Sequence, residues 1–108
     1  MASVTLNGNH ISDWDSFHAE SQRAFGFPEF YGRNMSAWID CLSYLRDDEN
    51  MSKFRLFPNE MLRIEVSHSA TLKQRMPEIL DEVTFCIESI NERYADYGEK
   101  PALELILN

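Results

Sequence analysis

The sequence predicts one small α/β domain spanning residues 1–108, with a three-stranded parallel sheet and helices packed on it. The length suits a single domain, which can bury one core without disulfides or a structural metal. Short apolar segments typical of strands occur at both ends and in the middle of the chain. Longer segments with the 3.6-residue period of helices separate them. Strands separated by helices pair in parallel through right-handed crossovers, which gives the predicted architecture.

The first strand is expected at residues 4–6 and ends in the turn at residues 7–9, because Asn and Gly tolerate the positive φ of tight turns. Ser12 has the position of an N-cap, and the two aspartates that follow suit the first turn of a helix. This helix is expected to end at Gly26. Its predicted buried stripe is Trp14, Phe17, Ser21, Ala24 and Phe25.

A loop over residues 27–33 precedes a second helix, which Asn34 is expected to cap. The apolar positions of this helix follow the 3.6-residue period and are Met35, Trp38, Ile39, Leu42 and Leu45. On another face Ser36, Asp40 and Tyr44 follow one another at intervals of four residues, which stacks them.

The second half of the chain begins with a polar, irregular segment at residues 46–59, which predicts a long surface loop. Alternation over residues 62–66 predicts the second strand. Ser69 is expected to start a short helix, and Pro77 suits the first turn of a long helix that ends at Gly98. The apolar run at residues 102–107 predicts a last strand that lies inside the sheet. The expected buried stripe of the long helix is Ile79, Leu80, Val83, Cys86, Ile87, Ile90, Tyr94 and Tyr97.

Charge narrows the classes of partner. The chain carries 18 acids and 10 bases, a formal net charge of -8, so nucleic acid and anionic membranes are disfavoured and a basic protein is favoured. Residues 77–99 hold seven acids and one base, whereas residues 51–75 hold five bases and two acids. We therefore expect two electrically different sides. The sequence shows neither a signal segment nor an apolar run of the roughly 18–20 residues that a membrane helix needs, which predicts a cytoplasmic protein.

Residue patterns of catalytic and metal sites are sparse. The histidines lack metal-ligand spacing and no glycine-rich phosphate loop is present, so His10, His18 and His68 are expected at the surface. Cys41 and Cys86 lie in apolar-periodic segments and are expected to be buried free thiols, although a Cys41–His pair stays open. The acidic residues 47–49 lack the pattern of a calcium loop. We expect no cofactor, no metal and no enzymatic activity; a metal-dependent hydrolase using carboxylates of the last helix is the remaining enzymatic alternative.

The segment at residues 27–42, FPEFYGRNMSAWIDCL, is the strongest candidate for a binding surface. Its aromatic side chains precede a helix that is expected to present Asp40 outward, and aromatic anchors beside a carboxylate suit a protein interface. The alternative is that Phe30 and Tyr31 only pack the loop onto the core.

This segment resembles the barstar family, whose members inhibit small secreted ribonucleases of the barnase type. The resemblance is carried by Pro28-Glu29-Phe30-Tyr31-Gly32-x-Asn34, then by Ala37 and Asp40-Cys41-Leu42. The opening strand and turn and the closing helix and strand support it. The resemblance implies a fold with this order of elements and an inhibitor whose loop and second helix block the nuclease active site. The contacts it implies are Phe30, Tyr31, Gly32, Asn34 and Asp40, with Glu92 on the last helix.

The sequence departs from the family pattern at three places. Ser36 replaces an acid, Phe30 replaces the usual tyrosine, and Arg33 puts a positive charge into the loop. Each change is expected to weaken binding to a strongly cationic cleft. The predicted function is an inhibitor or immunity-type protein for a basic ribonuclease or related toxin, monomeric when free. The alternative is a non-inhibitory interaction module that binds another cationic protein. The predicted contact residues are Phe30, Tyr31, Gly32, Arg33, Asn34, Ser36, Asp40, Tyr44 and Glu92.

Overall fold

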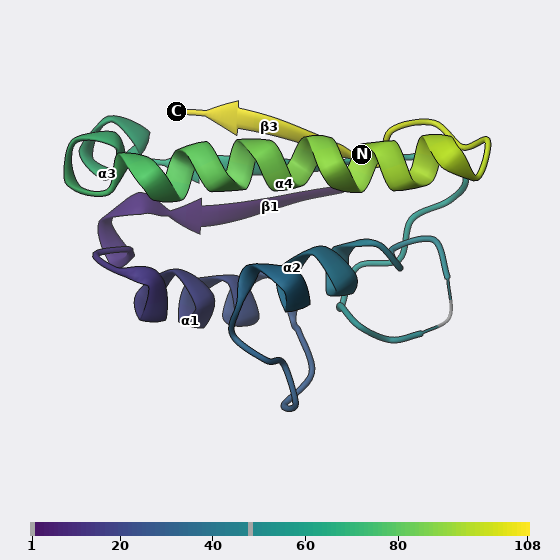
Figure 1. Cartoon of the computed structure of the whole chain (residues 1–108), viewed down its shortest axis with the longest axis horizontal. Helices are drawn as coiled ribbons and strands as arrows, with labels where there is room; N and C mark the ends of the chain where they lie inside the picture. Colours follow the sequence, from purple (N-terminus) through teal and green to yellow (C-terminus); the bar gives the residue numbers. More distant parts are fainter. Residues whose placement is uncertain (1, 48) are drawn as a thin grey trace.

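The computed structural model describes residues 2–47 and 49–108 and confirms the predicted α/β class. Asp48, within the acidic run noted above, lies outside the described residues. Figure 1 shows α4 running along the sheet, with α1 and α2 beside it on the side of β1. The elements in chain order are β1 (Ala2–Asn7), the 3-10 helix η1 (Gly8–His10), α1 (Trp14–Phe25), α2 (Met35–Leu42), β2 (Leu62–Ser67), α3 (Ser69–Arg75), α4 (Pro77–Asp96) and β3 (Leu103–Leu107).

The sheet is three-stranded and parallel, as predicted, and its strand order is β1-β2-β3. Val4 pairs with Ile64, and Ile64 pairs with Leu105. Val4 and Ile64 are buried, whereas their neighbours Thr5 and Glu65 are exposed and half-buried. Successive side chains of a strand point to opposite faces, so one face of the sheet is buried and the other is mostly polar, with Ile106 beside Glu65 as an apolar residue on it.

The prediction that the last strand lies inside the sheet is wrong. β2 is the central strand and β3 forms an edge, where Leu107 is 52% exposed. An apolar run indicates that side chains of a strand are covered by helices. It does not indicate how many strands are paired to it, because strands pair through their backbones.

Asp13, and not the predicted Ser12, caps α1. The Asp13 carboxylate accepts the Ser16 N–H at 2.8 Å, and Ser16 Oγ accepts the Asp13 N–H at 3.0 Å. This reciprocal arrangement satisfies two free N–H groups, which favours Asp13 as the cap. The hydrogen bond from the Ser16 backbone also lowers the pKa of Asp13. The helix stops at Gly26 as predicted, in the left-handed conformation with φ of 67°.

α2 is shorter than predicted. Asn34 caps it as expected, but the helix ends at Leu42. Tyr44 and Leu45 therefore lie in the following turn and not on the predicted faces of the helix, although Leu45 is buried. The tight turn after Leu42 begins at Ser43, whose backbone N–H donates to the Asp40 carbonyl.

The predicted surface loop contains no helix or strand among its described residues. It is nevertheless tied to the body of the protein. The Leu56 N–H donates to the Leu45 carbonyl at 2.8 Å, and the Lys53 N–H donates to the Phe25 carbonyl at 2.9 Å. The Arg46 guanidinium donates to the carbonyls of Lys100 and Glu60 at 2.8 and 3.0 Å, which closes the loop against the segment before β3.

α3 and α4 begin at Ser69 and Pro77, as predicted. The stripe of α4 is buried as far as Tyr94, but Tyr97 is 83% exposed. This part of the prediction is wrong because α4 ends at Asp96 and the helical period does not extend to the residue after it. In the part of the chain that the structure describes, no helix is both long and apolar enough to cross a membrane.

The core contains Trp38, Phe25 and Phe17, all at most 1% exposed. Trp38 Nε1 donates to the Ser21 hydroxyl at 3.2 Å, so the indole N–H keeps a partner inside the core. Cys41 and Cys86 are buried free thiols, as predicted.

Two buried polar side chains of α1 were not expected. His10 and His68 are exposed as predicted, but His18 is only 4% exposed, so the prediction of a surface position is wrong for this histidine. Its ring stacks with Trp14, which covers it. Glu20 is equally buried and accepts the Asn7 N–H at 2.8 Å. Burial opposes ionisation of Glu20, but hydrogen bonds from Arg23 and Asn7 outweigh it and lower its pKa.

Candidate protein-binding surface

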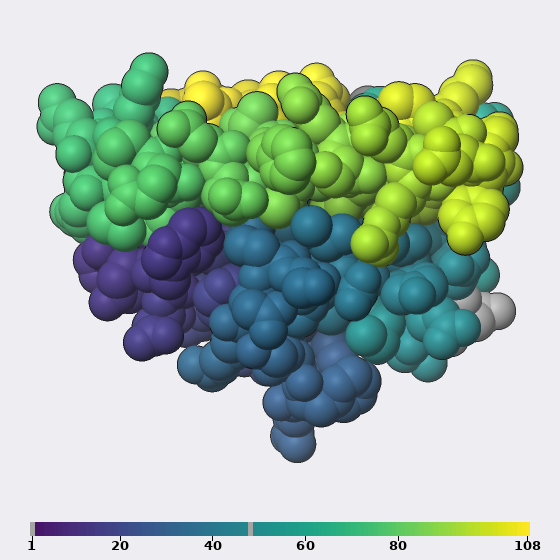
Figure 2. Space-filling view, viewed as in Figure 1, coloured from purple at the N-terminus to yellow at the C-terminus, as the bar shows by residue number. Residues whose placement is uncertain are grey.

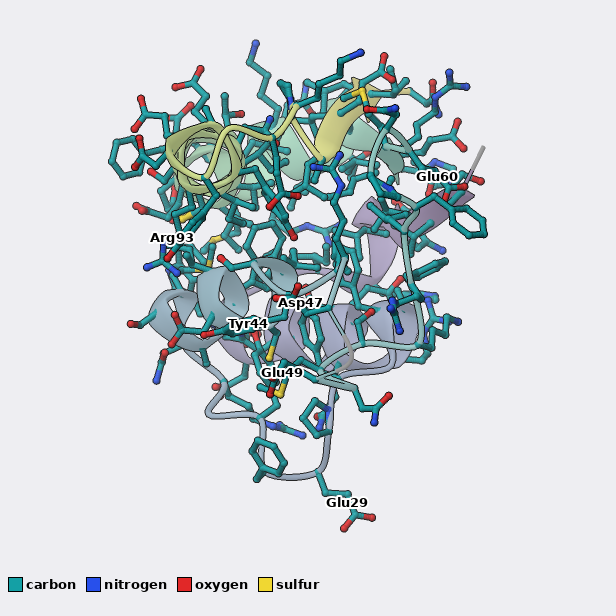
Figure 3. All side chains as sticks on the ribbon, turned by 90° about the vertical axis from the view of Figure 1, so that its right-hand side faces the viewer. Glu29, Tyr44, Asp47, Glu49, Glu60 and Arg93 are labelled. Atoms are coloured by element: carbon teal, nitrogen blue, oxygen red, sulfur yellow. The ribbon has the colours of Figure 1, made fainter. Side chains whose placement is uncertain are left out.

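The loop between α1 and α2 projects from the body of the molecule (Figures 1 and 2). Figure 3 shows Glu29 at its far end. Phe30, the next residue, is 75% exposed. Exposed aromatic side chains that can be covered by a partner are common anchors of protein interfaces. The loop therefore carries an apolar side chain to a position where a partner can reach it.

Tyr31 fixes this loop from the inside. It is 6% exposed, its ring centroid lies 4.7 Å from that of Phe27, and its hydroxyl lies 2.7 Å from Nδ1 of His18. Burial raises the pKa of Tyr31, so the hydroxyl stays protonated. The sequence left open whether Phe30 and Tyr31 pack onto the core or are available to a partner. Tyr31 packs onto the core, whereas Phe30 is exposed. A direct contact between Tyr31 and a partner stays a prediction for which little surface is available.

Three polar positions shape the base of the loop. Asn34 Oδ1 accepts the Ala37 N–H at 2.8 Å, and its Nδ2 donates to the Gly32 carbonyl at 3.3 Å, so this side chain holds the start of α2. Arg33 has a φ of 53°, a left-handed conformation that costs a residue with a side chain about 1–2 kcal/mol. The Arg33 guanidinium donates to Gln22 Oε1 at 3.3 Å. Arg33 is exposed in the same loop as the projecting Phe30.

Asp40 and Ser36 are exposed on α2, as predicted. Asp40 is already paired within the chain, because Arg93 Nη1 of α4 lies 3.3 Å from Asp40 Oδ1. Arg93 Nη1 also donates to the Ser43 hydroxyl at 3.2 Å, and Ser43 Oγ donates to the Ile39 carbonyl at 2.6 Å. The guanidinium therefore sits at the C-terminal end of α2, where the helix dipole favours a cation. About half of each charged side chain stays exposed.

A cleft of about 440 Å³, here called the α2–α4 cleft, lies between the turn after α2 and the C-terminal end of α4. Figure 3 shows Tyr44 and Asp47 on one side of this region and Arg93 on another. The Tyr94 hydroxyl accepts the Leu45 N–H at 3.0 Å and donates to the Leu42 carbonyl at 3.2 Å, which fixes the turn to α4. The residues lining the cleft are Ser43, Tyr44, Asp47, Arg93, Tyr94, Asp96, Tyr97 and Glu99.

A shallower hollow of about 330 Å³ lies at the other end of α2. Two of the predicted contact residues, Arg33 and Asn34, line it together with Trp14, Asp15, His18, Met35 and Glu82. Glu92 is exposed on α4 but lines neither this hollow nor the α2–α4 cleft. The structure thus brings the loop, α2 and the turn after α2 together, while Glu92 stands apart from both concave regions.

Comparison with known proteins identifies the family. The family model "Barstar (barnase inhibitor)" matches residues 1–106. The chain belongs to the barstar family. A search of curated proteins gives no significant match. Membership of the barstar family supports a protein partner in general, and the family is one of inhibitors and not of catalysts.

The catalytic alternatives find little support in this barstar-family structure. Burial raises the pKa of Cys86 to about 11 and also raises that of Cys41, so both thiols stay protonated at neutral pH. In the described residues His18 contacts the Tyr31 hydroxyl and the Trp14 ring, and His10 contacts Asn7 and Glu20, so neither of these histidines pairs with Cys41. No group of at least three His, Cys, Asp or Glu side chains able to hold a metal ion occurs in residues 2–47 and 49–108.

Sequence reasoning missed the pairing of Arg93 with Asp40. The available signal was composition, since Arg93 is the only base among the seven acids of residues 77–99. This composition suggests that Arg93 pairs with an acid. The acids closest to it in sequence are those of its own helix, so the sequence pattern does not point to Asp40. The partner that the barstar fold supplies lies 53 residues away on α2.

Proposed function

We propose that this barstar-family protein binds and blocks the active site of a small basic ribonuclease of the barnase type, as an inhibitor or immunity-type protein. We further propose that it acts in the cytoplasm, is monomeric when free and has no enzymatic activity of its own. The observation that carries the proposal is that one continuous loop and helix exposes both an aromatic side chain, Phe30, and a carboxylate, Asp40. Family membership supports it independently.

The chemistry of an RNA-binding cleft suits these two groups. Such a cleft offers basic side chains to phosphates and flat apolar surface to bases. A carboxylate can take the place of a phosphate, and each hydrogen bond to a charged group contributes about 1.5–3 kcal/mol. The formal net charge of -8 adds long-range attraction to a basic protein, which speeds association at low salt.

The positive charges of Arg33 and Arg93 lower the affinity that we expect for a cationic partner. Arg33 follows Phe30 in the same loop, and Arg93 already pairs with Asp40. A partner that offers only cations to this surface meets like charge at both places, while Ser36 offers no charge where an acid is expected. The proposed affinity is therefore lower than that of a surface with uncompensated acids.

The experiment that tests the proposal is calorimetric titration of a barnase-type ribonuclease with wild-type protein and three variants. Phe30→Ala and Asp40→Asn should each weaken binding at least about 30-fold, the loss of about 2 kcal/mol typical of an interface hot spot. Asp81→Asn is the matched control: it removes the same charge from an exposed position of α4, three turns before Arg93, and should change affinity less than threefold. Equal losses in Asp40→Asn and Asp81→Asn would refute the assigned surface.

A second candidate function is a non-inhibitory interaction module that binds a different cationic protein. The observation that favours it is the compensation of Asp40 by Arg93, because an inhibitor of a strongly cationic cleft gains from a free carboxylate. The same titration separates the two candidates. Absence of measurable heat and of inhibition with barnase-type ribonucleases at micromolar protein would favour the interaction module.

A further inference from the structure

We infer that the outer edge of β3 is a self-association site, at which β3 of a second copy of this chain pairs with it in antiparallel orientation. Among the described residues, β3 has one neighbour in the sheet, β2. Figure 1 shows β3 at the border of the sheet away from α1 and α2. The site is therefore separate from the proposed ribonuclease-binding surface, and the inference goes beyond the proposed function.

The hydrogen bonds to β2 show which backbone groups of β3 are left over. The Leu62 N–H donates to the Ala102 carbonyl at 2.8 Å, and the Asn108 N–H donates to the Val66 carbonyl at 3.0 Å. In a parallel ladder the groups that bond to the neighbouring strand belong to every second residue, so the even-numbered residues of this segment face β2. The backbone N–H and C=O groups that point away from β2 are those of Leu103, Leu105 and Leu107.

The fold satisfies these outward groups at the start of the strand. Asn91 of α4 accepts the Leu103 N–H at 3.0 Å and donates its Nδ2 to the Leu103 carbonyl at 3.1 Å. In the part of the chain that the structure describes, the backbone groups of Leu105 and Leu107 have no such side-chain partner. Their N–H and C=O groups therefore form an open edge, which is a template for another strand.

The sequence of β3 lacks the features that usually protect an edge strand. Its residues pair with β2 in an unbroken register, so no bulge interrupts the edge, and it contains neither proline nor lysine. Its one charged residue, Glu104, already pairs with Arg63. Leu107 is 52% exposed, and Leu105 and Ile106 are half-buried. The strand thus presents apolar side chains as well as free backbone groups at the edge.

A second copy fits this edge because β3 is complementary to itself. With a two-fold axis at Ile106, Leu105 of each copy lies opposite Leu107 of the other, and the two residues exchange both N–H···O bonds. The two Ile106 side chains then cover each other on the mostly polar face of the sheet. Glu104 lies opposite Asn108, so no like charges face each other across the axis.

The expected pairing is weak and strengthens with salt. It joins two short strands, so we expect it to bury less than the roughly 1,200 Å² of a stable specific interface and the free protein to stay monomeric at micromolar concentration. Each copy carries a formal net charge of -8, and added salt screens the repulsion between the copies. Self-association should therefore rise with salt, whereas binding to a basic ribonuclease falls.

The first arm of the test is sedimentation equilibrium at low and at high salt. With a dissociation constant on the order of 1 mM, wild type at ~1 mM and high salt should have a weight-average mass about 1.5 times that of one chain. Ile106→Lys places two like charges opposite each other at the axis and should keep the mass of one chain. Thr5→Lys is the matched control, because Thr5 lies in the same cross-strand row and face but on β1, and it should associate like wild type. A monomeric wild type, or equal association of the two variants, would overturn the inference.

Amide hydrogen exchange measured by NMR is a second arm that needs no variant. In dilute protein the N–H groups of Leu105 and Leu107 should exchange faster than those of Glu104 and Ile106, which face β2. At ~1 mM protein and high salt, where about half of the chains are paired, exchange of the two leucine amides should slow about twofold while the other two stay unchanged. A rise in mass without this slowing would place the contact elsewhere and overturn the inference.

Discussion

At the scale of single residues, Arg93 partly compensates the negative charge of Asp40 on the proposed binding surface. It holds Asp40 through Nη1 while both side chains stay about half exposed. We predict that Arg93→Gln raises affinity for a barnase-type ribonuclease about fivefold, because an exposed ion pair that a partner must displace is worth about 1 kcal/mol. Binding should also become more sensitive to salt, since the surface becomes more negative when the positive charge of Arg93 is removed.

The control for Arg93→Gln is Lys73→Gln, which makes the same change of charge at an exposed position of α3. Its affinity should stay within twofold of wild type. Calorimetry at two salt concentrations measures both variants. A loss of affinity in Arg93→Gln would show that Arg93 positions Asp40 for the partner and does not compete with it.

His18 is expected to make the free energy of unfolding depend on pH near neutrality. Burial, and then the charge of Arg33, lower the pKa of His18 below its ordinary value of 6.5, while Asp15 opposes them and the acid Glu82 lines the same hollow. The unfolded chain therefore takes up a proton before the folded chain does. The contribution of neutral His18 is fully present above about pH 6.5 and is lost as pH falls through the folded pKa.

Urea unfolding at a series of pH values between about 7.5 and 5.5 measures this dependence. His18→Phe removes the titrating group and should flatten the curve in that window, whereas His68→Gln, a change at an exposed histidine, should leave the slope unchanged. A His18→Phe curve parallel to that of wild type would assign the pH dependence to other groups.

At the scale of elements, Tyr94 ties α4 to the turn that follows α2. Its hydroxyl is the partner of the buried Leu45 N–H and donates to the Leu42 carbonyl. Tyr94→Phe should lower the free energy of unfolding by about 1–3 kcal/mol, because it leaves a buried N–H without a partner. Tyr97→Phe removes an exposed hydroxyl three residues later and should change it by less than about 0.5 kcal/mol. Equal effects in urea unfolding would contradict this role of Tyr94.

At the scale of the whole molecule, the two thiols report on opening of the fold. Cys41 lies on α2 and Cys86 on α4, both are buried, and burial raises both pKa values. We predict that a thiol reagent modifies the native protein at least about 100-fold more slowly than the urea-unfolded chain, because protonated buried thiols react only after opening. Fast modification of one thiol before unfolding would show that its helix opens independently.

Much of the fold could be predicted from the sequence because its signals are local. The periods of α1 and α4, the Asn34 cap and the Gly26 stop each depend on residues a few positions apart. The misses depend on distant partners or on competition between neighbours. The edge position of β3 and the burial of His18 between Trp14 and the Tyr31 hydroxyl follow from packing that spacing does not encode. Asp13 is the cap in place of Ser12 because its carboxylate accepts the Ser16 backbone N–H, a hydrogen bond that depends on the local geometry of the helix start.

The candidate surface was predictable only in part, for the same reason. The motif around Phe30 and Asp40 is contiguous in sequence, and the structure places both side chains at the surface. The α2–α4 cleft joins Tyr44 and Asp47 to residues about 50 positions later, and nothing in the local pattern links them. Tyr44 was predicted as part of a helical face and instead lies in the turn that forms one wall.

We propose that the loop and α2 of this barstar-family protein block a ribonuclease active site. The most direct measurement is the RNA-cleaving activity of a barnase-type ribonuclease titrated with purified protein at low and at physiological salt. We predict stoichiometric loss of activity with an equivalence point at one-to-one, and weaker inhibition at the higher salt concentration. Full ribonuclease activity at micromolar protein and low salt would contradict the claim.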